Sequence, residues 1–165
     1  MKRAVVALGS NLGDSRRILT QAVTALDALP GTGILAVSGL YRTAPWGYAD
    51  QPDFLNAAVL LATPLSPRAL LGACLGIEAA AGRRRTFANA PRPLDLDLLL
   101  YEGVVMQEPE LTLPHPRMQE RAFVLVPLAD LFPDGEALGY RFTEYLRRAD
   151  RSGVEALGPW FPPQE

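Results

Sequence analysis

Two amphipathic helical segments alternate with strand-like runs, and this order is the strongest constraint on the fold. Apolar residues recur at helical spacing between Asp14 and Pro30, and again between Ser66 and Gly82. The strand-like runs are residues 3–8, 34–41, 54–63 and 94–101. The resulting order, β-α-β-β-α-β, predicts an α+β protein with a ferredoxin-like α/β sandwich, in which helices pack on a mostly antiparallel sheet.

Further elements are expected after the fourth strand. The pattern predicts a short strand over 104–106, a helix over 116–131 bent at Pro127, and a last helix over 141–149. The tail from about residue 159 is rich in proline and is expected to be loose. We expect residues 1–165 to form a single domain with extra C-terminal helices, because 165 residues is a usual length for one domain.

Charge and cysteine content exclude several classes of protein. Sixteen basic and 18 acidic residues give a net charge of −2, which disfavours nucleic-acid and anionic-membrane binding. A lone cysteine, Cys74, excludes an internal disulfide and a multi-cysteine zinc site. No apolar run approaches the ~18 residues of a membrane span, and the run 4–8 is too short for a secretion signal. We therefore expect a cytoplasmic protein with neither a nucleic-acid nor a membrane partner.

An acidic pair, Asp95 and Asp97, is the most informative feature of the fourth strand. Alternate strand residues share a face, so the two carboxylates point the same way while Leu96 and Leu98 point into the core. Two neighbouring carboxylates repel each other, and Mg²⁺ is the hard cation that such oxygens hold together with substrate phosphates. Taken alone, this pattern is more often a solvated strand face.

Basic residues beside the acidic pair favour a polyphosphate ligand. Arg83, Arg84, Arg85 and Arg92 precede the strand directly. Cations next to a metal-binding acidic pair suit the charge of a polyphosphate. The alternative is a solvated loop whose arginines pair only with the aspartates, and such surface pairs contribute little to stability.

His115 lies in a second candidate phosphate-binding segment. It is the only histidine and is held between two prolines, six residues before Arg121. Both side chains are candidate phosphate contacts, although a lone histidine is more often structural.

A flat heterocycle has a candidate site between aromatic side chains. Phe54 and Phe123 are candidates to sandwich such a ring, although core packing is the commoner role of phenylalanine. Asn56 offers both a donor and an acceptor, and the segment 43–47 offers backbone groups. The segment 9–13 lacks the spacing of a phosphate-binding loop and is interpreted as a turn.

Several of these segments together resemble one enzyme family, 6-hydroxymethyl-7,8-dihydropterin pyrophosphokinase of folate biosynthesis. The resemblance covers almost the whole chain, and its two most specific stretches are PRPLDLDLLLY at 91–101 and PHPRMQERAFVL at 114–125. It is also carried by ALGSNLG at 7–13, YRT at 41–43 and QPDFLNAA at 51–58.

The resemblance implies an activity, a cofactor and a set of binding residues. The implied enzyme transfers the diphosphate of ATP to the hydroxymethyl oxygen of the pterin and releases AMP, acts as a monomer, and uses two Mg²⁺ ions held by Asp95 and Asp97. The residues implied to bind ATP or assist the transfer are Arg83, Arg85, Arg92, Leu98, Thr112, His115 and Arg121. Those implied to bind the pterin are Thr43, Ala44, Trp46, Phe54, Asn56, Asp95 and Phe123.

The basic loop departs from the family pattern at three positions. Ala88 replaces a usual basic residue, Asn89 an often aromatic one, and Thr86 stands where a lysine can occur. The departure puts the phosphate partners within this loop in doubt.

Two other functional classes are weighed against this interpretation. A ferredoxin-like RNA-binding module needs a basic surface and exposed aromatic residues on the sheet. The net charge of −2 and the lack of an RNP-like aromatic strand disfavour this class. A different metal-dependent nucleotidyltransferase would also use two aspartates, and it would typically recruit a further carboxylate. Glu78 is the nearby candidate, but its position on the second helix favours a structural role.

Overall fold

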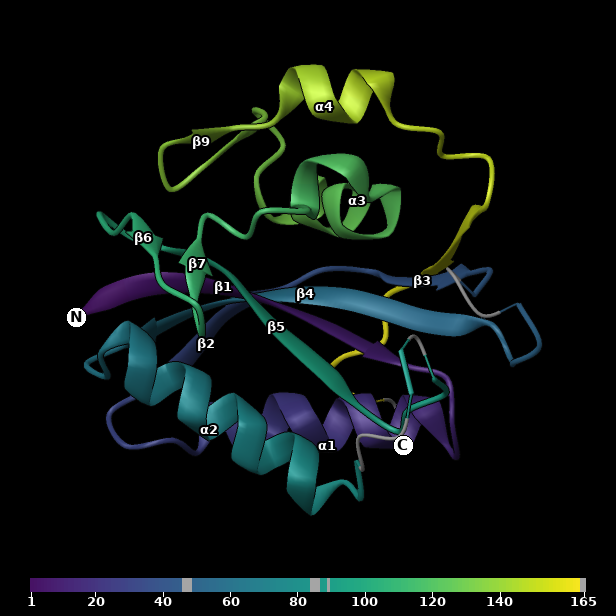
Figure 1. The fold of residues 1–165 in the computed structure, drawn as a ribbon, viewed down its shortest axis with the longest axis horizontal. Coiled ribbons are helices and arrows are strands. Elements are labelled where there is room, and N and C mark those ends of the chain that lie inside the picture. Colours follow the sequence, from purple (N-terminus) through teal and green to yellow (C-terminus); the bar gives the residue numbers. More distant parts are fainter. Residues whose placement is uncertain (46–48, 84–86, 89, 164–165) are drawn as a thin grey trace.

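The computed structural model describes residues 1–45, 49–83, 87–88 and 90–163. Within these residues the main sheet has six strands, and all paired neighbours run antiparallel (Figure 1). The strands are β1 (Lys2–Ser10), β2 (Gly33–Val37), β3 (Leu40–Thr43), β4 (Phe54–Thr63), β5 (Asp95–Tyr101) and β10 (Val154–Gly158). The path is β10-β3-β4-β1-β5, and β2 also pairs with β4.

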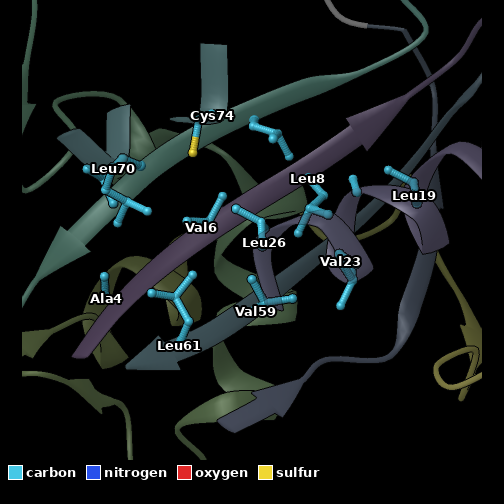
Figure 2. Close-up of a cluster of buried hydrophobic side chains, with 14 of the residues drawn as sticks. Ala4, Val6, Leu8, Leu19, Val23, Leu26, Val59, Leu61, Leu70 and Cys74 are labelled. Carbon is cyan, nitrogen blue, oxygen red and sulfur yellow. The ribbon is translucent and has the colours of Figure 1, made fainter. Parts of the chain in front are cut away.

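Helices cover both faces of this sheet. The helices α1 (Ser15–Asp27) and α2 (Pro67–Ala80) lie on one face, and α3 (Ala122–Leu131) and α4 (Thr143–Arg148) lie on the other (Figure 1). Each face has its own buried cluster: Val6 and Leu8 pack towards α1 and α2 (Figure 2), whereas Val5 packs towards α3. The unbroken apolar run of β1 follows from this burial on both faces.

The predicted α+β class is confirmed. The first five strands and two helices follow the order β-α-β-β-α-β, except that the second predicted strand is divided into β2 and β3. The antiparallel path with β1 and β4 at its centre is consistent with a ferredoxin-like sandwich.

Local capping signals set the starts of the first two helices. The Asp14 side chain accepts a hydrogen bond from the backbone N–H of Arg17 at 3.3 Å, so Asp14 is the N-cap of α1. Ser66 caps α2 by accepting from the Ala69 N–H at 3.2 Å, and Pro67 follows at the first helical position.

The second predicted strand is interrupted at Ser38 and Gly39. Ser38 exchanges hydrogen bonds with the backbone of Ala58, accepting at its hydroxyl and donating from its backbone N–H. The Gly39 N–H donates to the Asp130 carboxylate at 3.0 Å instead of to a strand. These contacts join residues far apart in sequence, so local periodicity does not reveal the break.

The C-terminal elements are shorter than predicted. The expected helix over 116–131 begins only at Ala122, after a 3₁₀ turn (Met118–Glu120), and contains Pro127 as expected. The expected helix over 141–149 is the six-residue α4. The remaining short strands are β6 (Met106–Gln107), β7 (Thr112–Leu113), β8 (Glu136–Ala137) and β9 (Tyr140–Arg141). Among the described residues, no helix has both the length and the apolarity needed to cross a membrane.

Trp160, within the proline-rich tail that is expected to be loose, is buried against the sheet. After α4 the chain runs along β3 as β10 and reaches the α1 side of the sheet (Figure 1). Trp160 is 7% exposed, belongs to the α1/α2 cluster, and donates from Nε1 to the Ser38 carbonyl at 2.9 Å. One buried aromatic residue therefore fixes a segment whose composition suggested mobility.

Replacing Trp160 with alanine is expected to lower the free energy of unfolding by about 3 kcal/mol or more, because the change leaves a large cavity. The melting temperature, followed by circular dichroism, should fall by roughly 6 °C or more. Trp160→Phe should lower the free energy of unfolding by less, because it keeps an aromatic ring in the cavity, although it loses the N–H donor. Val105→Ala, at a position 78% exposed, is the control. A melting temperature unchanged in Trp160→Ala would contradict the packing described.

Candidate functional site

Three strands bring polar side chains together on the face of the sheet that α3 covers. In the strand register, Gly9 of β1 lies opposite Asn56 of β4 on one side and opposite Asp95 of β5 on the other. Ala7, two residues earlier, lies opposite Asp97. The predicted common face of Asp95 and Asp97 is therefore confirmed, and Asn56 shares it.

The absence of a side chain at Gly9 leaves room in the middle of this row. A Cβ atom there would lie 3.1 Å from Asn56 Oδ1, so a larger residue would crowd the Asn56 amide, and it would contact the Phe54 ring at an ordinary 3.9 Å. Gly9 thus forms part of the floor of a pocket.

The pocket encloses about 620 Å³ of empty space, part of it open to solvent. Its lining consists of Ala7, Leu8, Gly9, Thr43, Ala44, Phe54, Asn56, Arg92, Asp95, Asp97, Arg121, Phe123 and Val124. Aromatic, amide, acidic and basic groups therefore converge on one cavity.

Most of the predicted site residues lie in this lining. The pocket unites the predicted residues Thr43, Ala44, Phe54, Asn56, Arg92, Asp95, Asp97, Arg121 and Phe123. Two others, Trp46 and Arg85, lie outside the described residues, as do Thr86 and Asn89 of the altered loop.

Four predicted residues lie outside the pocket lining. Arg83 lies beside it and binds Asp95, and Thr112 lies in the short strand β7. The Leu98 side chain is buried in the α1/α2 cluster, so only its backbone remains as a candidate nucleotide contact. His115 is anchored beside β5, because its N–H donates to the Leu99 carbonyl at 2.9 Å.

The acidic pair is electrostatically strained. Burial, followed by the neighbouring charge of Asp95, raises the pKa of Asp97 to about 7, although Arg121 and Arg83 oppose the shift. A carboxylate held this way would gain from a further cation near it. Among the described residues no cluster of three or more His, Cys, Asp or Glu side chains offers a metal site. A metal ion here would therefore depend on the two aspartates and on oxygens from a ligand.

Arg83 connects the acidic pair to the end of α2. Its Nη1 donates to Asp95 Oδ1 at 2.6 Å and to Glu78 Oε2 at 2.8 Å. Burial lowers the pKa of Arg83, but the carboxylates outweigh this effect and the net shift is upwards. Glu78 is 5% exposed and also accepts from the Leu96 N–H at 2.7 Å, which agrees with the structural role expected for it.

Two arginines lie over the two aromatic rings of the pocket. The Arg92 guanidinium is 5.2 Å from the centre of the Phe54 ring, and that of Arg121 is 5.7 Å from the Phe123 ring. Arg92 Nε is buried without a hydrogen-bond partner among the described residues, and it lies 4.0 Å from Asp95 Oδ2. A buried donor of this kind indicates that an acceptor is missing.

The charge of Arg121 affects the protonation of His115, the other candidate phosphate contact of the segment 115–121. Burial, followed by the charge of Arg121, lowers the pKa of His115. The imidazole is therefore neutral at neutral pH, and its Nδ1 accepts from the Arg117 N–H at 3.3 Å. A neutral His115 can act as a hydrogen-bonding group there without adding positive charge.

Asn56 is held in place by Thr43. Its Nδ2 donates to the Thr43 hydroxyl at 2.7 Å, and both residues are buried. The amide oxygen then lies above Gly9, where it can accept a hydrogen bond from a flat ligand.

Sequence reasoning missed two residues of the segment 9–13, which it treated only as a turn. Strand β1 extends to Ser10, so Gly9 belongs to the sheet and lines the pocket. Asn11 follows and contacts two separate loops. The available signal was a glycine and a short polar run at the end of a buried strand.

Comparisons with known proteins identify close relatives. The family model described as 7,8-dihydro-6-hydroxymethylpterin-pyrophosphokinase (HPPK) matches residues 5–133. A protein of Methylorubrum extorquens named 2-amino-4-hydroxy-6-hydroxymethyldihydropteridine pyrophosphokinase is 50% identical over 157 residues, covering 95% of this chain and 99% of the relative. One of the same name from Pseudomonas aeruginosa is 45% identical over 158 residues, covering 95% and 98%.

Solved structures share the fold. The crystal structure of Plasmodium falciparum HPPK-DHPS wild type with SDX-DHP superposes with a TM-score of 0.68 at 15% identity and covers 94% of this chain. The chain spans 47% of that longer protein. At this identity the likeness concerns the fold alone.

Proposed function

The chain belongs to the 7,8-dihydro-6-hydroxymethylpterin-pyrophosphokinase family, and on this basis we propose how its pocket performs the family reaction. The reaction transfers the diphosphate of ATP to the hydroxymethyl oxygen of 6-hydroxymethyl-7,8-dihydropterin and releases AMP, a step of folate biosynthesis. The observation that carries the proposal is one cavity whose lining combines two aromatic rings and an amide with two aspartates and two arginines.

The aromatic and amide side chains of the lining are proposed to bind the pterin. Phe54 and Phe123 offer ring faces for stacking, which favours a flat heterocycle. The Asn56 amide and the backbone of Thr43 and Ala44 offer donors and acceptors for the edge of the ring. Trp46, expected at the same edge, lies outside the described residues.

The charged side chains of the lining are proposed to bind the triphosphate of ATP. Arg92 and Arg121 line the pocket, and the unpartnered Arg92 Nε suits a phosphate oxygen. Arg83 and His115 are proposed to add to these charged groups from outside the lining, and Arg83 keeps Asp95 in place. Thr112 and the Leu98 backbone are proposed to lie near the nucleotide, and Arg85 is proposed to add a further phosphate contact from outside the described residues.

Two Mg²⁺ ions are proposed to be held by Asp95 and Asp97. The fit is supported by the shared face of the two carboxylates and by the raised pKa of Asp97, because a cation relieves the cost of burying that charge. When bound, the ions supply charge neutralisation for the triphosphate and lower the pKa of the attacking alcohol.

The protein contributes mainly by positioning the two substrates and stabilising charge. The stacked pterin presents its hydroxymethyl oxygen to the β-phosphorus, in line with the bond to the departing AMP. The Arg92 guanidinium lies over the Phe54 ring and near Asp95, so it is proposed to stabilise the charge that develops on the transferred group. The protein is proposed to act as a monomer.

Product analysis separates the proposal from nucleotidyl transfer. Incubation with ATP, the pterin and Mg²⁺ should yield AMP and a pterin diphosphate, and omission of the pterin or addition of EDTA should abolish both. Release of pyrophosphate with transfer of AMP to the pterin would contradict the assignment. Size-exclusion chromatography with light scattering tests the monomer.

A further inference from the structure

Asn11 joins the segment that precedes Phe54 to the segment that carries Arg92, and both Phe54 and Arg92 line the pocket. It is 3% exposed and lies directly after β1. Its Nδ2 donates to Gln51 Oε1 at 2.7 Å and to the Pro52 carbonyl at 3.1 Å. These two residues precede Phe54, the aromatic residue assigned to pterin stacking.

The other side of Asn11 holds the backbone of Arg92. Asn11 Oδ1 accepts from the Arg92 N–H at 2.9 Å, and the Asn11 N–H donates to the Arg92 carbonyl at 3.1 Å. Both backbone groups of Arg92 are thus fixed by one residue that is 81 positions away in sequence. The position of the Arg92 backbone is therefore held by a residue far away in sequence, in addition to the contacts within its own loop.

The chemistry of the amide explains why asparagine occupies this position. One donor group and one acceptor are needed on the same short side chain, because the acceptor meets an N–H and the donor meets two oxygens. An aspartate would place an oxygen against the Pro52 carbonyl, and a serine is too short to reach both loops.

We propose that Asn11 is a positioning residue for diphosphate transfer. It acts by holding the Arg92 backbone at a fixed place beside Gln51 and Pro52, which precede Phe54. The Arg92 guanidinium then lies over the Phe54 ring and near Asp95, where it faces both substrates. This inference rests on the proposed function, because it assigns Asn11 an effect through a residue that contacts the transferred group.

A double-mutant cycle tests whether Asn11 acts through Arg92. AMP formation is measured at saturating ATP and pterin in wild type, Asn11→Ala, Arg92→Ala and the double variant. Asn11→Ala should lower kcat about 10- to 100-fold, because small displacements of a positioned group are costly. In the Arg92→Ala background the same change should lower kcat no more than about threefold, since coupled residues are not additive.

Ser10→Ala is the matched control. Ser10 precedes Asn11, is fully buried, and donates its hydroxyl hydrogen bond to Ser15 rather than to the Arg92 loop. Its kcat should stay within about twofold of wild type, as expected for a site without contact to the pocket loops. Circular dichroism checks folding, and Asn11→Ser replaces Asn11→Ala in the cycle if the alanine variant unfolds.

Two outcomes would overturn the inference. One is an equal loss of kcat from the Asn11 change in both backgrounds, which would show a general structural effect. The other is a wild-type kcat in the folded Asn11 variant. Failure of the proposed function itself would look different, because the wild-type protein would then form no AMP from ATP and the pterin.

Discussion

Asp97→Ala is expected to lower AMP formation by about a hundred- to a thousandfold, the range typical for removal of one group that stabilises transition-state charge. Asp97 lies on the pocket face of β5 beside Asp95, and burial raises its pKa to about 7. Loss of this carboxylate removes one of the two acidic groups that the described residues contribute to the pocket lining. Turnover is measured as AMP released at saturating ATP, pterin and Mg²⁺.

The same variant should remain folded, because the buried carboxylate does not stabilise the protein without a cation. A raised pKa means that the folded state binds the proton more tightly than the unfolded chain does. Stability from this group is therefore lost as the pH rises from about 4 to about 7, and is absent at pH 8. Asp97→Asn, which keeps the shape, should melt at or above the temperature of metal-free wild type at pH 8.

Controls make this prediction specific to the pocket. Mg²⁺ with a non-hydrolysable ATP analogue should raise the melting temperature of wild type more than that of Asp97→Asn. Asp134→Asn changes an exposed aspartate outside the pocket lining and should leave turnover unchanged. AMP release near the wild-type rate in Asp97→Ala would contradict the role assigned to the acidic pair.

The parts of the fold that were predictable are those encoded by local patterns. The caps at Asp14 and Ser66 and the shared face of Asp95 and Asp97 follow from residue type and spacing within a few positions. Two-residue strands such as β6–β9 have no periodicity to detect. The docking of Trp160 on Ser38 joins residues 122 positions apart, so no local pattern in the tail predicts this contact.

The same distinction applies to the site. Family motifs identified most of the lining residues, because the motifs contain them directly. The roles of Gly9 and Asn11 depend on strand register and on contacts between loops, which no local pattern specifies. Strand alternation correctly predicted that the Leu98 side chain faces the core, whereas the motif match alone implied a nucleotide contact that only the Leu98 backbone can make.

Arg92→Ala is expected to lower kcat about a hundredfold or more while changing the KM for the pterin no more than about threefold. The Arg92 guanidinium lies over Phe54 and near Asp95, and its buried Nε has no acceptor among the described residues. The Arg92 guanidinium interacts most strongly with a phosphate oxygen that carries extra negative charge. Such charge develops in the transition state, so the interaction should stabilise the transition state more than the bound substrates. Steady-state kinetics with varied pterin separates kcat from KM.

Arg92→Lys distinguishes charge from geometry in this prediction. Lysine keeps the positive charge but lacks the planar fork that binds two oxygens and lies flat on a ring, so it should restore only part of the activity. Arg42→Ala is the control, because Arg42 is exposed and pairs with Glu155 at 3.4 Å across β3 and β10, outside the pocket lining. If Arg92→Ala instead raised the pterin KM and left kcat unchanged, Arg92 would bind the pterin in its ground state rather than stabilise the transferred diphosphate.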